Sequence, residues 1–277
     1  MASPHVTFDD LSTATPEAVV AAVSAARSRS RLRFRTFFVL TWLVLVGGFV
    51  TAILSTGRID GAFLGEWAPF ILGGIPLTIF VAVLSIFFAT VFAILGALGR
   101  LSRVSPIYSI ATLYVSMVRG TPLIVQVIFV YSALPEFGIV LDALVAGTFA
   151  LSFNYGAYMT EIFRAGIQAI PRGQVEAAEA LGMTGSDVMR RVVLPQAIRI
   201  VIPAIGNEFI AMIKDSALVS YVGLHELFWR ARTVGSANFQ TFGTLMTAAL
   251  VYWLMTIVFS LVQERLEKRM AEGEVRL

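Results

Sequence analysis

The sequence predicts an all-α integral membrane protein with about six transmembrane helices. Hydrophobic residues fill 57% of the 277 positions and charged residues only 14%, whereas soluble domains average about 25% charged. The apolar residues also come in long runs without a charge, at 36–57, 67–99 and 233–263. Each run can cross hydrocarbon as a helix, which takes about 20 residues. The alternating pattern of a membrane β-barrel is absent from the sequence.

Six spans are expected, at about 36–55, 69–98, 106–134, 143–163, 200–222 and 241–262. Single charges interrupt the third and fourth spans, at Arg119 and Glu161. The first span follows a run of arginines and could be a signal peptide. Its uncharged stretch, 36–57, is longer than the about 7 to 15 apolar residues of such a peptide, so we predict a retained helix.

The positions of the basic residues indicate the orientation. If both termini are cytoplasmic, the inside segments hold 16 of the 21 lysines and arginines. The positive-inside rule then places four segments on the cytoplasmic side: a tail at 1–35, a short loop with Arg100 and Arg103, a loop at 164–199, and the C-terminal end from Arg265 onward, which includes a tail at 269–277. Cysteine is absent, which excludes disulfides and thiolate metal sites, and we predict no metal site.

The cytoplasmic segment 164–199 predicts two short helices joined by a tight turn. Pro171 is suited to open the first helix, and Gly182 to cap it in the left-handed conformation. Thr184 and Asp187 have the spacing of a capping box for the second helix, and we expect Pro195 to end it. Two short capped helices could also form an ordinary loop between membrane helices. The spacing of the residues decides between an ordinary loop and a functional motif.

That spacing resembles a known motif. Glu176-Ala177-Ala178 is followed three residues later by Gly182, and nine residues after that come Val192 and Leu194-Pro195. The pattern is similar to the EAA loop of permease subunits of ATP-binding cassette (ABC) importers, with valine in place of isoleucine at 192. The resemblance implies that this loop docks in a cleft of a separate ATPase and transmits its closure to the membrane helices. The residues so implicated in ATPase coupling are Glu176, Ala177, Ala178, Gly182, Leu194 and Pro195.

The resemblance extends over about 74–268 and is closest to the branch that takes up polar amino acids, including histidine, glutamine, arginine, glutamate, cystine and opines. The segments that carry it are 119–126, 154–158, 161–164, 207–209 and 214–218. It implies a type I ABC importer transmembrane domain at 69–268 in a bacterial cytoplasmic membrane. Permeases of this branch usually have five spans, so the helix at 36–55 is an addition that the resemblance does not explain.

The resemblance also implies partners. These are an ATPase dimer that binds ATP and magnesium, a second permease subunit of the same or a sister chain, and an extracytoplasmic amino-acid-binding protein. The chain itself has no G-x-x-x-x-G-K-[ST] sequence, so we predict no ATPase site, no catalytic residue and no cofactor in it. The expected ligands are a polar amino acid and the lipid bilayer, and no nucleic acid.

Polar residues within the spans are candidates for the substrate pathway, because charges in hydrocarbon are costly and usually face a cavity or a partner. They are Arg119, Asn154, Tyr158, Glu161, Asn207, Glu208, Lys214 and Asp215. Alternatively, Glu161, Lys214 and Asp215 only join helices by pairing with neighbours. Arg119 lies in mid-membrane if 106–134 is one helix kinked at Pro122, and lies shallow if 105–118 follows the inner interface.

Two other functions fit the sequence less well. An ion-coupled secondary transporter would also have intramembrane charges, but no internal inverted repeat is visible and such a protein has no use for an EAA loop. A membrane-embedded hydrolase would need a nucleophile with a base. The two histidines, His5 and His225, lie outside the predicted spans, and neither H-E-x-x-H nor a suitable G-x-S-x-G occurs.

Overall fold

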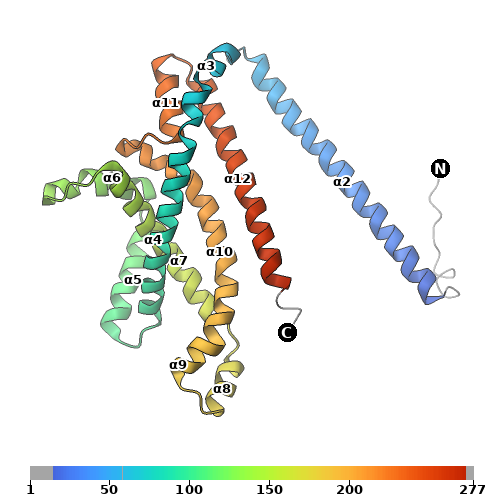
Figure 1. Ribbon diagram of the computed structural model, residues 1–277, viewed down its shortest axis with the longest axis vertical. Helices are drawn as coiled ribbons and strands as arrows, with labels where there is room; N and C mark the ends of the chain where they lie inside the picture. Colours follow the sequence, from blue (N-terminus) through green and yellow to red (C-terminus); the bar gives the residue numbers. More distant parts are fainter. Residues whose placement is uncertain (1–14, 58, 273–277) are drawn as a thin grey trace. The chain divides into compact units, whose positions relative to one another are not determined.

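A computed structural model describes residues 15–57 and 59–272, and the chain divides into two compact units. Unit 1 is Met1–Ile59 and unit 2 is Asp60–Leu277. The described residues are predominantly helical, in agreement with the predicted fold class (Figure 1). The outermost parts of the predicted tails, 1–14 and 273–277, lie outside the described residues.

The described residues of unit 1 form a long helix, α2 (Pro16–Ser55). The helix begins 20 positions before the predicted span at 36, so the inner part of the predicted tail is helical. The sequence explains this extension, because 17–46 is rich in alanine, leucine and arginine and contains neither glycine nor proline. Its segment Ser30–Ile53 is long and apolar enough to cross a membrane.

Unit 2 is a helical bundle. Its elements are α3 (Gly61–Leu72), α4 (Ile75–Leu101), α5 (Ser105–Arg119), α6 (Leu123–Ser132), the 3-10 turn η1 (Leu134–Phe137), α7 (Ala143–Gln168), α8 (Arg172–Ala180), α9 (Gly185–Val188), the π-helical turn η2 (Met189–Val193), α10 (Leu194–Asp215), the 3-10 turn η3 (Ser216–Val222), α11 (Leu227–Ala237) and α12 (Thr241–Glu272). Figure 1 shows α8 and α9 at one end of this unit and α3 and α11 at the other.

Helix α7 lies at the centre of the bundle and packs most extensively against α4. Small residues bring the two helices together: a Cβ added to Gly156 would lie 2.5 Å from Phe92 Cβ, and one added to Gly96 would overlap the hydroxyl of Thr160. Close approach at small residues is typical of helix packing in membranes, where lipid provides no hydrophobic drive for association. The main apolar core joins α4 and α7 to α3, α10, α11 and α12.

Within the described residues, four helical segments are long and apolar enough to cross a membrane, and a fifth span results if α5 and α6 are counted as one. The remaining predicted span, the fourth at 143–163, corresponds to α7, which is 26 residues long but does not reach that apolarity. Its central position explains the difference, since 13 of its residues are buried against other helices rather than exposed to lipid.

The third predicted span is broken. Helices α5 and α6 meet at an angle of 104° across Gly120, Thr121 and Pro122. Pro122 lacks a backbone N–H and keeps the preceding residue out of the helical region, so one continuous helix cannot pass through this point without distortion. The chain therefore does not form one modestly kinked helix over 106–134.

The expectation that Pro195 ends a helix is wrong. The chain passes from α9 through the π-helical turn η2 directly into α10, and Pro195 lies in the first turn of α10. A proline is tolerated there because its missing N–H has no helical partner in a first turn. The wider π turn before it connects α9 to α10 without a loop.

A buried carboxylate joins three helices at the end of unit 2 where α3 and α11 lie. Glu226 is fully buried and caps α11, accepting hydrogen bonds from the backbone N–H groups of Phe228 (2.8 Å) and Trp229 (2.7 Å). The Tyr252 hydroxyl of α12 donates a third (2.6 Å), and Thr78 of α4 accepts from the N–H of Leu227 (3.2 Å). Burial raises the pKa of the Glu226 carboxyl above its ordinary value, although these hydrogen bonds oppose the shift.

Replacing Glu226 with alanine should leave three donors without an acceptor and lower the free energy of unfolding by on the order of 3 kcal/mol. Thermal unfolding of the purified protein in detergent measures the loss. Glu226→Gln keeps an acceptor and is neutral at every pH. Because the pKa is raised in the folded state, wild-type stability should fall as pH rises through the interval between the ordinary and the raised pKa, and the Gln variant should not share this fall. A stability difference that does not change with pH would contradict the assignment.

Candidate functional site

A polar cavity of about 440 Å³ lies beside the break between α5 and α6. Residues of the break, of α7 and of α10 line it: Arg119, Gly120, Thr121, Pro122, Leu123, Asn154, Tyr155, Tyr158, Glu208 and Asp215. Five of the eight residues predicted for the substrate pathway are among them. Segments more than 90 positions apart in the sequence therefore contribute to one site.

The side chain of Gln126 holds the break in place. Its amide nitrogen donates to the carbonyl oxygens of Val118 (2.8 Å) and Thr121 (3.2 Å) and to the Thr121 hydroxyl (2.7 Å). Its amide oxygen accepts from the side chain of Asn154 on α7 (3.2 Å). Carbonyls at the end of a helix have no intrahelical partner, and Gln126 supplies one. Asn154 itself is only 4% exposed, so the contact fixes the cavity wall to the centre of the bundle.

Aromatic side chains position the charged groups of the cavity. The Tyr155 hydroxyl donates to a carboxylate oxygen of Asp215 (2.7 Å), which joins α7 to the end of α10. The guanidinium carbon of Arg119 lies 5.0 Å from the centre of the Tyr158 ring, a cation–π distance. The cavity thus presents one guanidinium and, from α10, the two carboxylates of Glu208 and Asp215.

Three predicted pathway residues lie outside this cavity. Asn207 is exposed and accepts a hydrogen bond from Gln263 of α12 (3.0 Å). Lys214 is exposed in the last turn of α10 and has no ion pair within the described residues. Glu161 lies one turn beyond Tyr158 on α7 and makes contacts of a different kind.

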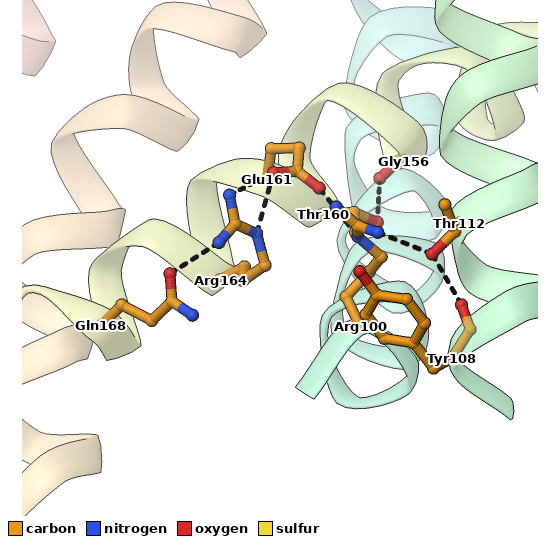
Figure 2. A network of polar contacts seen from close by, with 8 residues as sticks. All are labelled: Arg100, Tyr108, Thr112, Gly156, Thr160, Glu161, Arg164 and Gln168. Carbon is orange, nitrogen blue, oxygen red and sulfur yellow. Dashed lines mark hydrogen bonds and ion pairs between the residues drawn. The ribbon is translucent and has the colours of Figure 1, made fainter. Parts of the chain in front are cut away.

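Glu161 is held between two arginines, in the network drawn in Figure 2. Arg100 of α4 donates through Nε to one carboxylate oxygen (3.2 Å), and Arg164 of α7 donates through Nε (2.8 Å) and Nη2 (2.6 Å) to the other. Arg100 also donates to the Thr112 hydroxyl of α5 (2.6 Å). The three charged side chains are 18 to 29% exposed. This network joins α4, α5 and α7, and it favours the alternative in which Glu161 connects helices.

The predicted coupling segment forms helix α8, a turn at Gly182 and helix α9. Gly182 has φ of +81°, the left-handed conformation expected of it, and the N–H of Met183 donates to the Ala178 carbonyl to close the helix end (3.2 Å). Thr184 accepts from the N–H of Asp187 as the predicted cap (3.3 Å). Ala178 is buried in a small cluster with Ile170, Val188 and Val193.

The outward face of this segment includes a residue that the sequence analysis missed. Leu181 is 84% exposed, next to Gly182, and Ala177 and Glu176 are exposed on the preceding turn. This leucine therefore adds an apolar side chain to the exposed surface of the predicted coupling segment. The position of Leu181 immediately before the capping Gly182 is the sequence feature that could have predicted its exposure. Gln126 was missed too, although a lone amide in the apolar run 123–130, four residues after a proline, was a comparable signal.

Comparison with known proteins identifies the family. Residues 89–272 match the family model described as the binding-protein-dependent transport system inner membrane component. The chain belongs to this family. It is a membrane-spanning permease subunit of an ABC importer, and the alternative of a secondary transporter is not supported.

Several curated members of the family are similar over most of their length. The L-cystine transport system permease protein TcyB of Bacillus subtilis (strain 168) is 41% identical, over 73% of this chain and 87% of its own. The arginine transport system permease protein ArtQ of the same organism is 37% identical, over 74% and 94%. A putative glutamine transport system permease protein, GlnP of Rickettsia bellii, is 36% identical, over 73% and 93%.

Solved structures support the importer fold. The crystal structure of an amino acid ABC transporter with histidines contains a chain 38% identical to this one, with a TM-score of 0.73 over 76% of this chain and 99% of that chain. A chain of the MetNI methionine ABC transporter shares the fold at 19% identity, with a TM-score of 0.62. The predicted type I importer architecture is thereby confirmed for unit 2.

Replacing Glu161 with glutamine should weaken the network of Figure 2 and lower the free energy of unfolding by about 1 to 3 kcal/mol, because two partly buried guanidinium groups lose their counter-charge. Asp187→Asn is the matched control: its pair with Arg191 is exposed at 3.6 Å, and the asparagine oxygen can still accept the hydrogen bond from the Thr184 hydroxyl, so stability should change by less than about 0.5 kcal/mol. Thermal unfolding measures both. Equal effects of the two substitutions would contradict a joining role for Glu161.

Proposed function

We propose that this chain carries a polar amino acid across the bacterial cytoplasmic membrane by alternating access, driven by a separate ATPase. The observation that carries the proposal is the polar cavity at the α5–α6 break, with a guanidinium and two carboxylates around it. Relatives named for cystine, arginine and glutamine transport support the substrate class.

The charges of the cavity suit a zwitterion. A carboxylate group of the substrate would pair with Arg119, whose planar guanidinium favours two parallel hydrogen bonds to such a group. An ammonium group would pair with Glu208 or Asp215. With two carboxylates against one guanidinium, the lining has an excess negative charge, which favours substrates that carry a second cationic group. A hydrophobic substrate without charges would supply no counter-charge to any of the three groups.

Coupling to the ATPase would run through α8 and the turn at Gly182. The exposed Leu181 and the alanine face of α8 would enter a cleft of the ATPase, and Gln196 of α10 is hydrogen-bonded to Gln174 of α8 (2.7 Å). Movement of α8 would thus reach α10, the helix that bears Glu208 and Asp215. The other partners we propose are a second permease subunit and an extracytoplasmic binding protein, with both termini of this chain in the cytoplasm.

Substitution of Asp215 with asparagine, or of Glu208 with glutamine, should raise the amino-acid concentration needed for half-maximal uptake about tenfold, because each removes a partner of the substrate ammonium group. Uptake of labelled amino acids into vesicles holding the assembled transporter measures this change. Lys214→Met is the control. It removes a charge next to Asp215 in the sequence but outside the cavity, so it should leave the half-saturating concentration unchanged. A larger effect at Lys214 than at Asp215 would contradict the proposed site.

Gly182→Val should uncouple ATP hydrolysis from uptake while membrane insertion stays normal. A β-branched residue resists the left-handed backbone, so the turn beside Leu181 must change shape. Gly173→Val is the matched control, because Gly173 lies within α8 with open space around its Cα. Co-purification of the ATPase and receptor-stimulated ATP hydrolysis are the measurements. Equal behaviour of the two valine variants would contradict the coupling role of this turn.

A further inference from the structure

The arginine segment of α2 has no counterpart in the function proposed above, and the family match begins only at residue 89. Arginine occupies every second position from 27 to 35, namely Arg27, Arg29, Arg31, Arg33 and Arg35. The apolar segment that can cross a membrane, Ser30–Ile53, overlaps the run and continues in the same helix. The guanidinium groups are therefore carried on a continuous helix at the end of a hydrophobic segment.

The charge of this segment is not neutralised within its own helix. From 18 to 59 the sequence contains no aspartate or glutamate, so no acidic residue lies three or four positions from any of these arginines. The side chains of Arg31, Arg33 and Arg35 are exposed, and within the described residues none of the three forms an ion pair. The basic cluster at the end of α12 differs, because Glu264 and Glu267 are interleaved with Arg265, Lys268 and Arg269.

The arrangement of the arginines distinguishes a lipid partner from a protein partner. Residues two apart on a helix diverge by about 200°, so Arg31 and Arg35 fall on one side and Arg33 on nearly the opposite side. A helix that docks in an acidic protein groove would gather its charges on one face. Charges on both sides suit an environment that surrounds the helix, as the headgroup layer of a bilayer does.

An aromatic stripe extends from the arginines into the apolar segment. Phe34, Phe38 and Trp42 follow one another at four-residue intervals, with ring centroids 6.2 and 6.0 Å apart. All three are exposed. Aromatic side chains, tryptophan above all, are enriched where a helix passes from headgroups to hydrocarbon. The stripe therefore indicates that the arginines lie at headgroup level.

We propose that the arginine segment 27–35 of α2 binds the phosphate groups of anionic phospholipids and enriches them around this helix. Guanidinium groups bind phosphate through paired hydrogen bonds and are held near anionic membrane surfaces by charge. The partner is the bilayer itself, and the segment contains none of the residues assigned to the amino-acid cavity or to ATPase coupling.

The test uses the full-length chain, which is naturally free of cysteine. Thr36→Cys places a fluorophore just past the arginines. Vesicles contain equal amounts of phosphatidylglycerol and phosphatidylcholine, with bromine, which quenches the fluorophore, on the acyl chains of one lipid or the other. Brominated phosphatidylglycerol should quench more strongly than brominated phosphatidylcholine, and the preference should weaken in high salt.

Two variants make the test specific. In R27Q/R29Q/R31Q/R33Q/R35Q, which removes every arginine of the segment, the preference for phosphatidylglycerol should be lost, so that the two brominated lipids quench equally. The corresponding variant with lysine at all five positions keeps the charge and should retain most of the preference. A fluorophore on Leu266→Cys, within the interleaved cluster of α12, should show little preference. Equal quenching by both lipids at position 36 when the arginines are intact, or a preference that survives in the glutamine variant, would overturn the proposal and leave an acidic protein as the required partner.

Discussion

The structure of the site depends on one constraint, which is that polar backbone groups cannot be left without partners away from water. Breaking a helix within an apolar bundle exposes carbonyl oxygens, and each one left unpaired in hydrocarbon costs several kcal/mol. Gln126 satisfies those of Val118 and Thr121 with one amide group and attaches the break to Asn154 on the central helix. With these carbonyls paired, α5 and α6 can meet at 104° at the Pro122 break, and the cavity lies beside this break.

A second consequence concerns how the cavity and the coupling segment are connected. Helix α10 begins directly after the π-helical turn and ends at Asp215, so one continuous helix of 22 residues, about 33 Å long, connects the α8–α9 segment to the cavity. Glu208 and Asp215 lie two turns apart on it. In the mechanism proposed above, a movement of α8 and α9 would therefore reach both carboxylates through one continuous helix, and it would link ATPase coupling to substrate recognition.

The fold class, the helical segments and the turn at Gly182 were predictable, because they follow from apolar runs and from local cap and turn chemistry. The contacts and angles between segments that lie far apart in the sequence were not predictable. Nothing near Glu161 in the sequence indicates that Arg100, 61 positions away, completes its ion-pair network. Pro195 was misassigned because a proline in the first turn of a helix and a proline that stops a helix look alike when a π-helical turn precedes it. The role of Gln126 depends on the 104° angle, which no local pattern specifies.

The most direct test of the account is an electron cryomicroscopy map of the assembled transporter with a saturating amino acid that it imports. The account predicts ligand density in the cavity beside Gly120 and Pro122, with the substrate carboxylate towards Arg119 and its ammonium group towards Glu208 or Asp215. Ligand density elsewhere in the membrane domain, with this cavity empty and these three side chains paired with one another, would contradict the central claim.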